Sequence, residues 1–313
     1  MKKILFSLFF GVSLSSCVKQ EKADLVIHNG AIFTFNEEEK IHDALAVSDG
    51  KVIEVGPEHY IMNKYLANEY LDLKKKVLLP QLIDPTIKNV RSSFSINLFN
   101  TDSSIFIKEL KSLESESINF YDSSLFGFYL GNSFNVDSTS YGKELFYGFL
   151  SNCFSANKVL SIEAKLINIH PFIFESICTT LKGYNDQRWN IRNAHLMDSA
   201  KITKMVDVNL IPIIPDSIYT NPKFSKKVDF IRRINGIICV SDFSKNLKGA
   251  YGTTEELKMK SRLNAISLKI EKMYGKIEPG YYANFNIYGQ TPFQESLKEK
   301  GTIKSYRKGK VEN

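Results

Sequence analysis

The chain has 313 residues and a mass of 35.7 kDa, and it is 43% hydrophobic and 24% charged. This composition excludes an intrinsically disordered chain, a collagen-like repeat and a small disulfide-stapled protein. The net charge is +7, and it becomes 7 − 2 = +5 if Lys2 and Lys3 are removed with an N-terminal signal. Because the remaining Lys and Arg residues are interleaved with Asp and Glu, no basic stripe indicates a nucleic-acid partner.

The N-terminus has the pattern of a secretory signal. Lys2 and Lys3 precede the apolar run 4–14, which is shorter than the roughly 20 residues of a membrane span. The ending Leu14-Ser15-Ser16-Cys17 resembles a bacterial lipobox. We therefore expect residues 1–16 to be removed and Cys17 to be lipidated, with an ordinary secretory signal as the alternative. Acyl chains on Cys17 make the membrane a partner and place the protein in the bacterial cell envelope, on its periplasmic or surface face.

Three further cysteines, Cys153, Cys178 and Cys239, are widely spaced and lie in apolar surroundings. This spacing forms neither a disulfide framework nor a C-x-x-C metal motif. We expect buried free thiols, and a single disulfide is the alternative.

Short strands are expected at the N-terminal end of the chain. Two β-hairpins between residues 24 and 56 are predicted by Asn29-Gly30 and Asp49-Gly50, because these pairs accept the positive φ angles of a two-residue turn. Further short strands are expected at 71–73 and 77–79.

Short strands are also expected at the C-terminal end of the chain, after one helix. A helix is expected from Thr254 to Met273, with Gly275 as its C-cap, followed by strands at 283–288 and 303–306. The two ends, 17–80 and 253–313, are therefore expected to share a small composite β-sandwich.

The middle of the chain, residues 81–252, alternates strand-like and helix-like runs. The strand-like runs are 159–164, 191–196, 210–214 and 236–240, and the clearest helix is 172–181. Such alternation is typical of an α/β fold with parallel strands. Because about 170 residues are few for an eight-fold barrel, we expect a shortened or distorted TIM-like (β/α) barrel that lacks elements around residues 91–140.

A series of motifs in fixed order extends over most of residues 23–310. The motifs occupy residues 23–30, 44–56, 79–84, 188–194, 209–215, 263–265 and 275–283. In this order and spacing the sequence resembles the amidohydrolase superfamily, specifically its formamide deformylase-like branch. The resemblance implies a metal-dependent hydrolase of C–N bonds, built as a barrel beside a small β-sandwich. In such enzymes zinc or another divalent ion activates a water, and an Asp at a strand end moves the proton.

The positions where the family binds its metal are substituted in this chain. Thr86 and Lys88 occupy the positions of the family's H-x-H motif, and Glu163 aligns with its next His. Asn193 replaces the His of the family's R-x-R-I-E-H-A strand, and Asp242 alone matches the catalytic Asp. An ammonium at Lys88 repels a cation and has no lone pair to offer. The comparison therefore predicts that the metal site is lost and that the protein carries no cofactor.

Two of the remaining residues have alternative interpretations. His195 lies two positions after Asn193 and, on a continuous strand, would face the same side as a displaced ligand; a partly buried structural His is the plainer interpretation. Asp242 is either a surviving catalytic base or a strand-end capping residue. A third hypothesis pairs Lys88 with Asp242 in place of the metal.

Three functions remain open at this point. The first hypothesis is a membrane-anchored pseudoenzyme that binds an unknown small molecule or envelope protein in the former active site. The second is a divergent hydrolase that uses Asp242 with His195, Glu163 or His170. The third is a purely structural envelope lipoprotein. The aromatic residues around 120–147 could line a ligand groove, although core packing is the simpler expectation.

Overall fold

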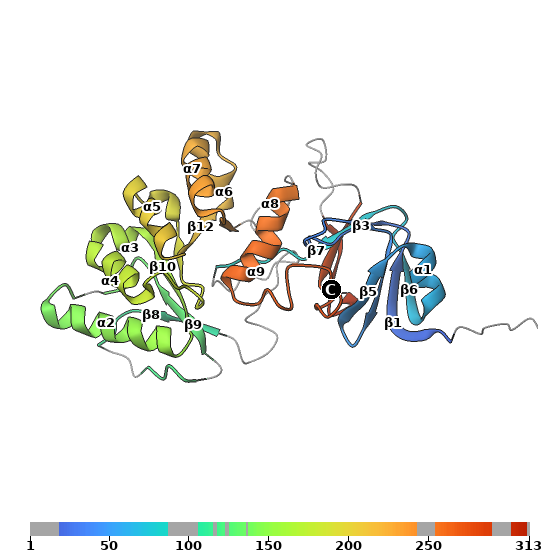
Figure 1. The fold of residues 1–313 in the computed structure, drawn as a ribbon, viewed down its shortest axis with the longest axis horizontal. Coiled ribbons are helices and arrows are strands. Elements are labelled where there is room, and N and C mark those ends of the chain that lie inside the picture. The colour runs from blue at the N-terminus through green and yellow to red at the C-terminus, as the bar shows by residue number, and fades with distance from the viewer. Residues whose placement is uncertain are drawn as a thin grey trace, which may run out of the picture.

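The computed structural model describes residues 19–86, 106–114, 118–122, 125–135, 137–242, 254–289 and 302–311. Two bodies follow one another along its long axis, a β-rich one and an α/β one, with the helical segment α8–α9 between them (Figure 1). Within the described residues, none of the helices is long and apolar enough to cross a membrane. The predicted signal peptide and Cys17 lie outside the described residues.

The β-rich body contains two sheets. The first has the order β5-β4-β1-β6 and the second the order β16-β15-β14-β7-β2-β3. Their strands are β1 (Glu21–His28), β2 (Ala31–Phe33), β3 (Ile41–His42), β4 (Ala44–Ser48), β5 (Lys51–Gly56), β6 (Tyr65–Asp72), β7 (Val77–Pro80), β14 (Phe285–Tyr288), β15 (Thr302–Arg307) and β16 (Lys310–Val311), and helix α1 (Glu58–Lys64) follows β5. Since β14 pairs with β7, the two chain ends share one sheet, as the sequence predicts.

Only one of the two expected hairpins is present. Ser48 and Lys51 pair across Asp49-Gly50, whose φ angles are both positive. The hairpin expected at Asn29-Gly30 is wrong, because β1 pairs with β4 and β6 while β2 belongs to the other sheet. The chain crosses between the sheets at this point, where a Cβ on Gly30 would lie 2.3 Å from the Leu73 side chain. Gly30 is therefore required by close packing rather than by a hairpin turn.

The α/β body is built on six parallel strands in the order β13-β12-β11-β10-β9-β8. The strands are β8 (Phe106–Leu110), β9 (Leu125–Leu130), β10 (Val159–Glu163), β11 (Asn190–Arg192), β12 (Ile211–Pro215) and β13 (Cys239–Ser241). The connection 111–124 between β8 and β9 forms no helix in its described parts. This α/β fold with a shortened unit agrees with the expected reduced TIM-like barrel.

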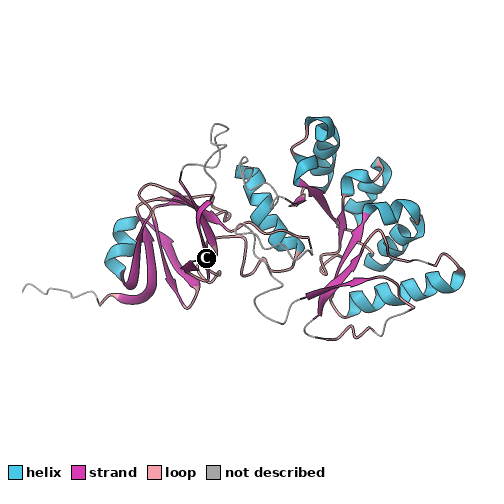
Figure 2. Cartoon of the chain, turned by 180° about the vertical axis from the view of Figure 1, so that it is seen from behind, coloured by secondary structure: helices cyan, strands magenta, loops and turns pink. Residues whose placement is uncertain are grey.

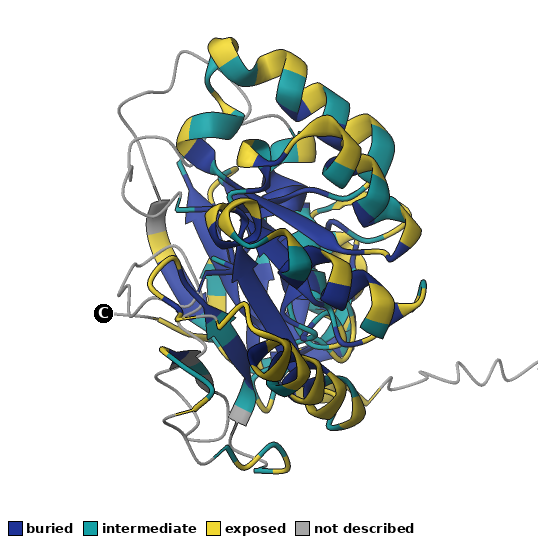
Figure 3. Ribbon diagram, turned by 90° about the vertical axis from the view of Figure 1, so that its left-hand side faces the viewer, coloured by how far each residue is buried: buried dark blue, intermediate teal, exposed yellow. Residues whose placement is uncertain are grey.

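One face of this sheet is covered by helices, as Figure 2 shows. They are α2 (Ser140–Ser155), α3 (Ala164–Ile169), α4 (Pro171–Leu181), α5 (Ser199–Asp207), α6 (Asp216–Tyr219) and α7 (Ser225–Asn235), with short 3₁₀ turns η1 (Ala194–Leu196) and η2 (Pro222–Phe224). Their buried sides point to the sheet and their exposed sides to solvent (Figure 3). Leu160, Ile162 and Ile191 pack in this core. Because strand residues alternate, Ser161, Glu163 and Arg192 face the opposite, inner side.

The last helical segment packs on that inner side rather than on the outer one. It consists of α8 (Thr254–Lys258), a π-helical turn η4 (Met259–Leu263) and α9 (Asn264–Ser267). Leu263 packs against Ile213 and Cys239, whose side chains face inward. The helix ends at Ser267, before the predicted Met273, since Lys269 has a positive φ of 59°. The chain then continues through turns to Gly275, which packs against Ala265.

The three described cysteines are free and buried, as expected. Burial raises the pKa of the Cys178 thiol to about 11 and that of Cys239 to about 12. Burial also raises the pKa of Cys153. Thiols of this kind are poor nucleophiles, so these residues act as small apolar side chains.

Asn264 joins three parts of the fold through one side chain. Its amide nitrogen donates to the carbonyl oxygens of Val240 (2.7 Å) and Ile83 (2.6 Å), and its oxygen accepts from the Val240 N–H (3.1 Å). It is fully buried. The amide therefore satisfies backbone groups at the edge of β13 that a further strand would otherwise pair.

We predict that Asn264→Ala destabilises the protein by about 3 kcal/mol, because buried backbone groups lose their partners. Asn168→Ala is the matched control, since that exposed amide makes one bond to the Leu196 carbonyl. The control is expected to cost less than about 0.5 kcal/mol. Denaturant unfolding measures both values, and equal losses would contradict this role of Asn264.

Candidate site at the carboxyl ends of the parallel strands

Charged side chains gather where the parallel strands end. Glu163 is the last residue of β10, Arg192 is the last of β11, and Asp242 follows β13. Tyr129 comes from the adjoining strand β9. Ligand sites in parallel α/β folds lie at this edge of the sheet, because the loops that follow the strands converge there.

Glu163 has both carboxyl oxygens occupied by hydrogen-bond donors. The Tyr129 hydroxyl donates to Oε1 at 2.8 Å, and the Asn193 side-chain amide donates to Oε2 at 2.8 Å. Glu163 is only 6% exposed. Burial and the hydrogen bond to Glu163 raise the pKa of Tyr129 to about 12, so its hydroxyl remains a donor at neutral pH.

Arg192 lies beside this network, in register with Glu163 on the adjoining strand. Its guanidinium carbon is 4.3 Å from the centre of the Tyr129 ring, and the residue is only 4% exposed. The Nε and Nη2 atoms are buried, and neither has a hydrogen-bond acceptor among the described residues. In the sequence resemblance, Arg192 stands at the position of the Glu in the E-H-A motif, but no role was predicted for it.

Asp84 joins the beginning of the α/β body to its last strand. Its Oδ1 accepts from the backbone N–H (2.8 Å) and the hydroxyl (2.7 Å) of Thr86, and its Oδ2 accepts from the Asp242 N–H (3.2 Å). Burial raises the pKa of Asp84, and the nearby Asp242 carboxylate raises it further. Thr86 therefore orients a carboxylate in this structure.

Asp242 ends β13 with a positive φ of 55°, and its side chain is half-buried. The Ser241 hydroxyl lies 3.5 Å from its Oδ2. Its role as a catalytic base stays a prediction. Lys88 lies outside the described residues, so its expected ion pair with Asp242 stays a prediction as well.

The interpretation of His195 as a displaced ligand rests on a strand over residues 191–196, and that expectation is wrong. Strand β11 ends at Arg192, Asn193 has a φ of 55°, and His195 lies in the 3₁₀ turn η1. Its ring packs on Phe224 with 5.8 Å between ring centres. Burial and the Lys227 ammonium lower the pKa of His195. The plainer interpretation, a partly buried structural His, fits this geometry.

A buried ion pair that sequence reasoning missed lies next to this edge of the sheet. The Lys260 Nζ is 2.7 Å from Oδ1 of Asp216, and the Lys260 side chain is only 1% exposed. Lys260 comes from η4 and Asp216 follows β12. Lys260 is one of three basic residues in the short run 258–262, and a charge run of this kind indicates solvent exposure from the sequence alone.

These side chains do not fit a divalent metal. Both oxygens of Glu163 and both oxygens of Asp84 already receive hydrogen bonds from fixed donors. The Arg192 guanidinium, in register with Glu163 on the adjoining strand, repels a cation and has no lone pair with which to coordinate it. Among the described residues, no group of three or more His, Cys, Asp or Glu side chains is placed to hold a metal ion.

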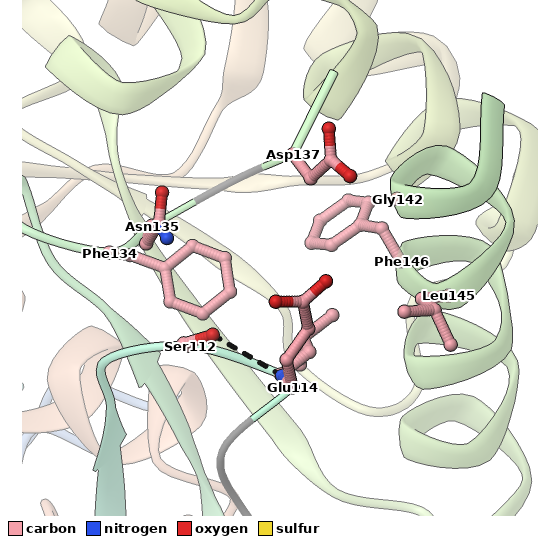
Figure 4. Close-up of a pocket in the computed structure, with 9 residues that line it drawn as sticks. Ser112, Glu114, Phe134, Asn135, Asp137, Gly142, Leu145 and Phe146 are labelled. Carbon is pink, nitrogen blue, oxygen red and sulfur yellow. Dashed lines mark hydrogen bonds between the residues drawn. The ribbon is translucent and has the colours of Figure 1, made fainter. Parts of the chain in front are cut away.

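The aromatic residues divide between the core and a surface groove. Phe128, Phe146 and Phe149 are buried, as core packing predicts. A small pocket of about 30 Å³, enough for roughly one water, lies between Phe134, Phe146 and the carboxyl groups of Glu114 and Asp137 (Figure 4). A wider groove of about 560 Å³ runs along α2. Its lining includes Leu113, Ile118, Phe120, Leu145 and Phe149.

The fold is similar to those of several solved enzyme structures. An adenosine deaminase from Xanthomonas campestris with bound zinc is 10% identical and has a TM-score of 0.64, with 94% of this chain and 93% of that chain covered. Guanine deaminase from E. coli is 10% identical with a TM-score of 0.64, and the match covers 92% and 98%. An amidohydrolase from Thermotoga maritima is 14% identical with a TM-score of 0.56, covering 92% and 99%.

These structural neighbours are amidohydrolase-superfamily enzymes, and the likeness concerns the fold alone. Models of protein families gave no match to this sequence, and neither did curated protein sequences.

We predict that Tyr129→Phe destabilises the protein by about 1–3 kcal/mol, because Glu163 loses a donor in a buried setting. In a double-mutant cycle with Glu163→Gln, the coupling energy is expected to be about 1–2 kcal/mol. Tyr147→Phe on the exposed side of α2 serves as the control. Additive losses in denaturant unfolding would contradict the network.

Proposed function

We propose that this chain is an amidohydrolase-like lipoprotein that binds a small molecule or an envelope partner at the former active site and does not hydrolyse by the metal-dependent route. The observation that carries the proposal is the buried guanidinium of Arg192 beside Glu163, at the strand ends where the family holds its metal ion. The positive charge required there comes from the protein itself. Among the described carboxyl groups at this edge, Glu163 and Asp84 already accept hydrogen bonds at both oxygens, which leaves Asp242 alone to bind a second, mobile cation.

The proposed anchor is the acylated Cys17. The described fold begins close to it, because the Gln20 side chain donates to the carbonyl of Asn63 at 3.2 Å, at the end of α1. Three residues of extended chain reach at most about 10 Å. The β-rich body is therefore expected to lie next to the membrane, with the parallel sheet farther from it. The proposed envelope location rests on the lipobox-like residues 14–17 and specifies no particular face.

A divergent hydrolase for non-peptide C–N bonds is the competing proposal. It is favoured by the fold and by Asp242. This half-buried residue directly follows β13, the position expected of an Asp that carries the proton. It is opposed by the position of His195, which packs against Phe224. The two proposals differ in whether the protein retains metal and turns over amides.

We predict that purified residues 18–313, prepared without chelator and dialysed against zinc or manganese, retain far less than one metal ion per chain. No hydrolysis of formamides or cyclic amides is expected under the same conditions. Elemental analysis measures the bound metal, and chromatography of the substrate and its hydrolysis product measures turnover. Stoichiometric metal that is lost in Asp242→Asn, together with turnover, would establish the hydrolase instead. His195→Gln shows whether that ring contributes.

A further inference from the structure

We propose that Arg192 is the anchor of a binding site for a ligand carboxylate, which deepens the proposed function by naming the ligand class. The observation behind the proposal is that two nitrogens of the Arg192 guanidinium have no hydrogen-bond acceptor among the described residues. Nε and Nη2 lie on the same edge of the group, and both are buried without an acceptor among the described residues. Leaving such donors unpaired in a buried setting costs free energy, which a suitable acceptor would recover.

The geometry of that edge matches one kind of acceptor. The Nε–H and one Nη2–H bond point in parallel, so the two oxygens of a single carboxylate satisfy both donors at once. The Tyr129 ring, 4.3 Å from the guanidinium carbon, holds the plane of the group in place. The guanidinium is therefore preorganised, and the ligand does not have to order the arginine.

The surrounding charges favour an anion with a single charge. Glu163 lies in register with Arg192 on the adjoining strand, and Asp84 and Asp242 lie at the same edge of the sheet. Three carboxyl groups already lie near the single guanidinium, so every further charge on a bound anion adds repulsion, and a doubly charged phosphate is repelled more than a singly charged carboxylate. A monocarboxylate is therefore the class that fits.

Burial also shapes how the ligand binds. Because the two nitrogens are shielded from solvent, a carboxylate in this position makes charge-assisted hydrogen bonds away from competing water. Neighbouring side chains have to shift before the ligand reaches the fork. We therefore expect association slower than that of a rigid open site.

The test is a titration of ¹⁵N-labelled residues 18–313 with acetate and with N-acetylglycine, followed through the arginine Nε–H resonances. We expect one Nε–H signal to shift saturably, and Arg192→Lys to weaken binding at least tenfold, because lysine keeps the charge and loses the fork. Arg232→Lys is the control, since Arg232 pairs with Asp229 on the surface of α7. Inorganic phosphate and chloride at equal ionic strength are the competing anions.

Several results would overturn the inference. One is the absence of a saturable shift, which means that the fork is satisfied by buried water. Phosphate that binds as tightly as acetate, or an unchanged affinity in Arg192→Lys, would also contradict it. If Arg192→Lys does not fold, the titration of the wild-type protein still shows whether one arginine Nε–H signal shifts saturably with carboxylate. Carboxylate binding together with metal-dependent turnover would refute the proposed function and keep the Arg192 site.

Discussion

A positive charge held inside the protein, the guanidinium of Arg192, is the constraint on which the site depends. Burying it is costly unless its surroundings compensate, and the fold supplies the ring of Tyr129 beneath it and acidic groups around it. Glu163 is in turn fixed by Tyr129 and Asn193. Asn193 and Thr86, at two positions where the sequence resemblance leads us to expect metal-binding imidazoles, donate hydrogen bonds to the carboxyl groups of Glu163 and Asp84.

The inner side of the parallel sheet, where Arg192 lies, is partly covered by a helical segment. The segment α8–α9 packs on the inner side of β12 and β13, with Leu263 against Cys239 and Ile213. Asn264 binds both the edge of β13 and the carbonyl of Ile83, and so joins the first and last described parts of the α/β body through one side chain. The ion pair of Lys260 and Asp216 lies in this contact as well. The reduced barrel is therefore held by side-chain hydrogen bonds and charges in addition to strand pairing.

Much of the architecture could be predicted from residue patterns, because it depends on local rules. Asp49-Gly50 closes a hairpin, the runs near 159–164 and 210–214 form buried parallel strands, and the chain ends share a sheet. The errors arise where distant contacts override those rules. Gly30 serves a crossing between sheets, and Asn193 adopts a positive φ that ends β11 and turns His195 away.

The candidate site was predictable only in outline. The motif comparison located Glu163, Asn193 and Asp242 at the strand ends, but it treated the substituted positions one at a time. The spacing of residues in the sequence does not specify side-chain directions. It therefore could not show that Arg192 lies over the Tyr129 ring or that Lys260 reaches Asp216.

The most direct test of the central claim is anomalous diffraction at the zinc edge from crystals of residues 18–313 grown with zinc. The account predicts the Arg192 guanidinium stacked on Tyr129, with both Glu163 oxygens hydrogen-bonded and no zinc peak at the strand ends. A zinc ion coordinated by Glu163 and Asp242, with Arg192 displaced from the ring, would contradict it.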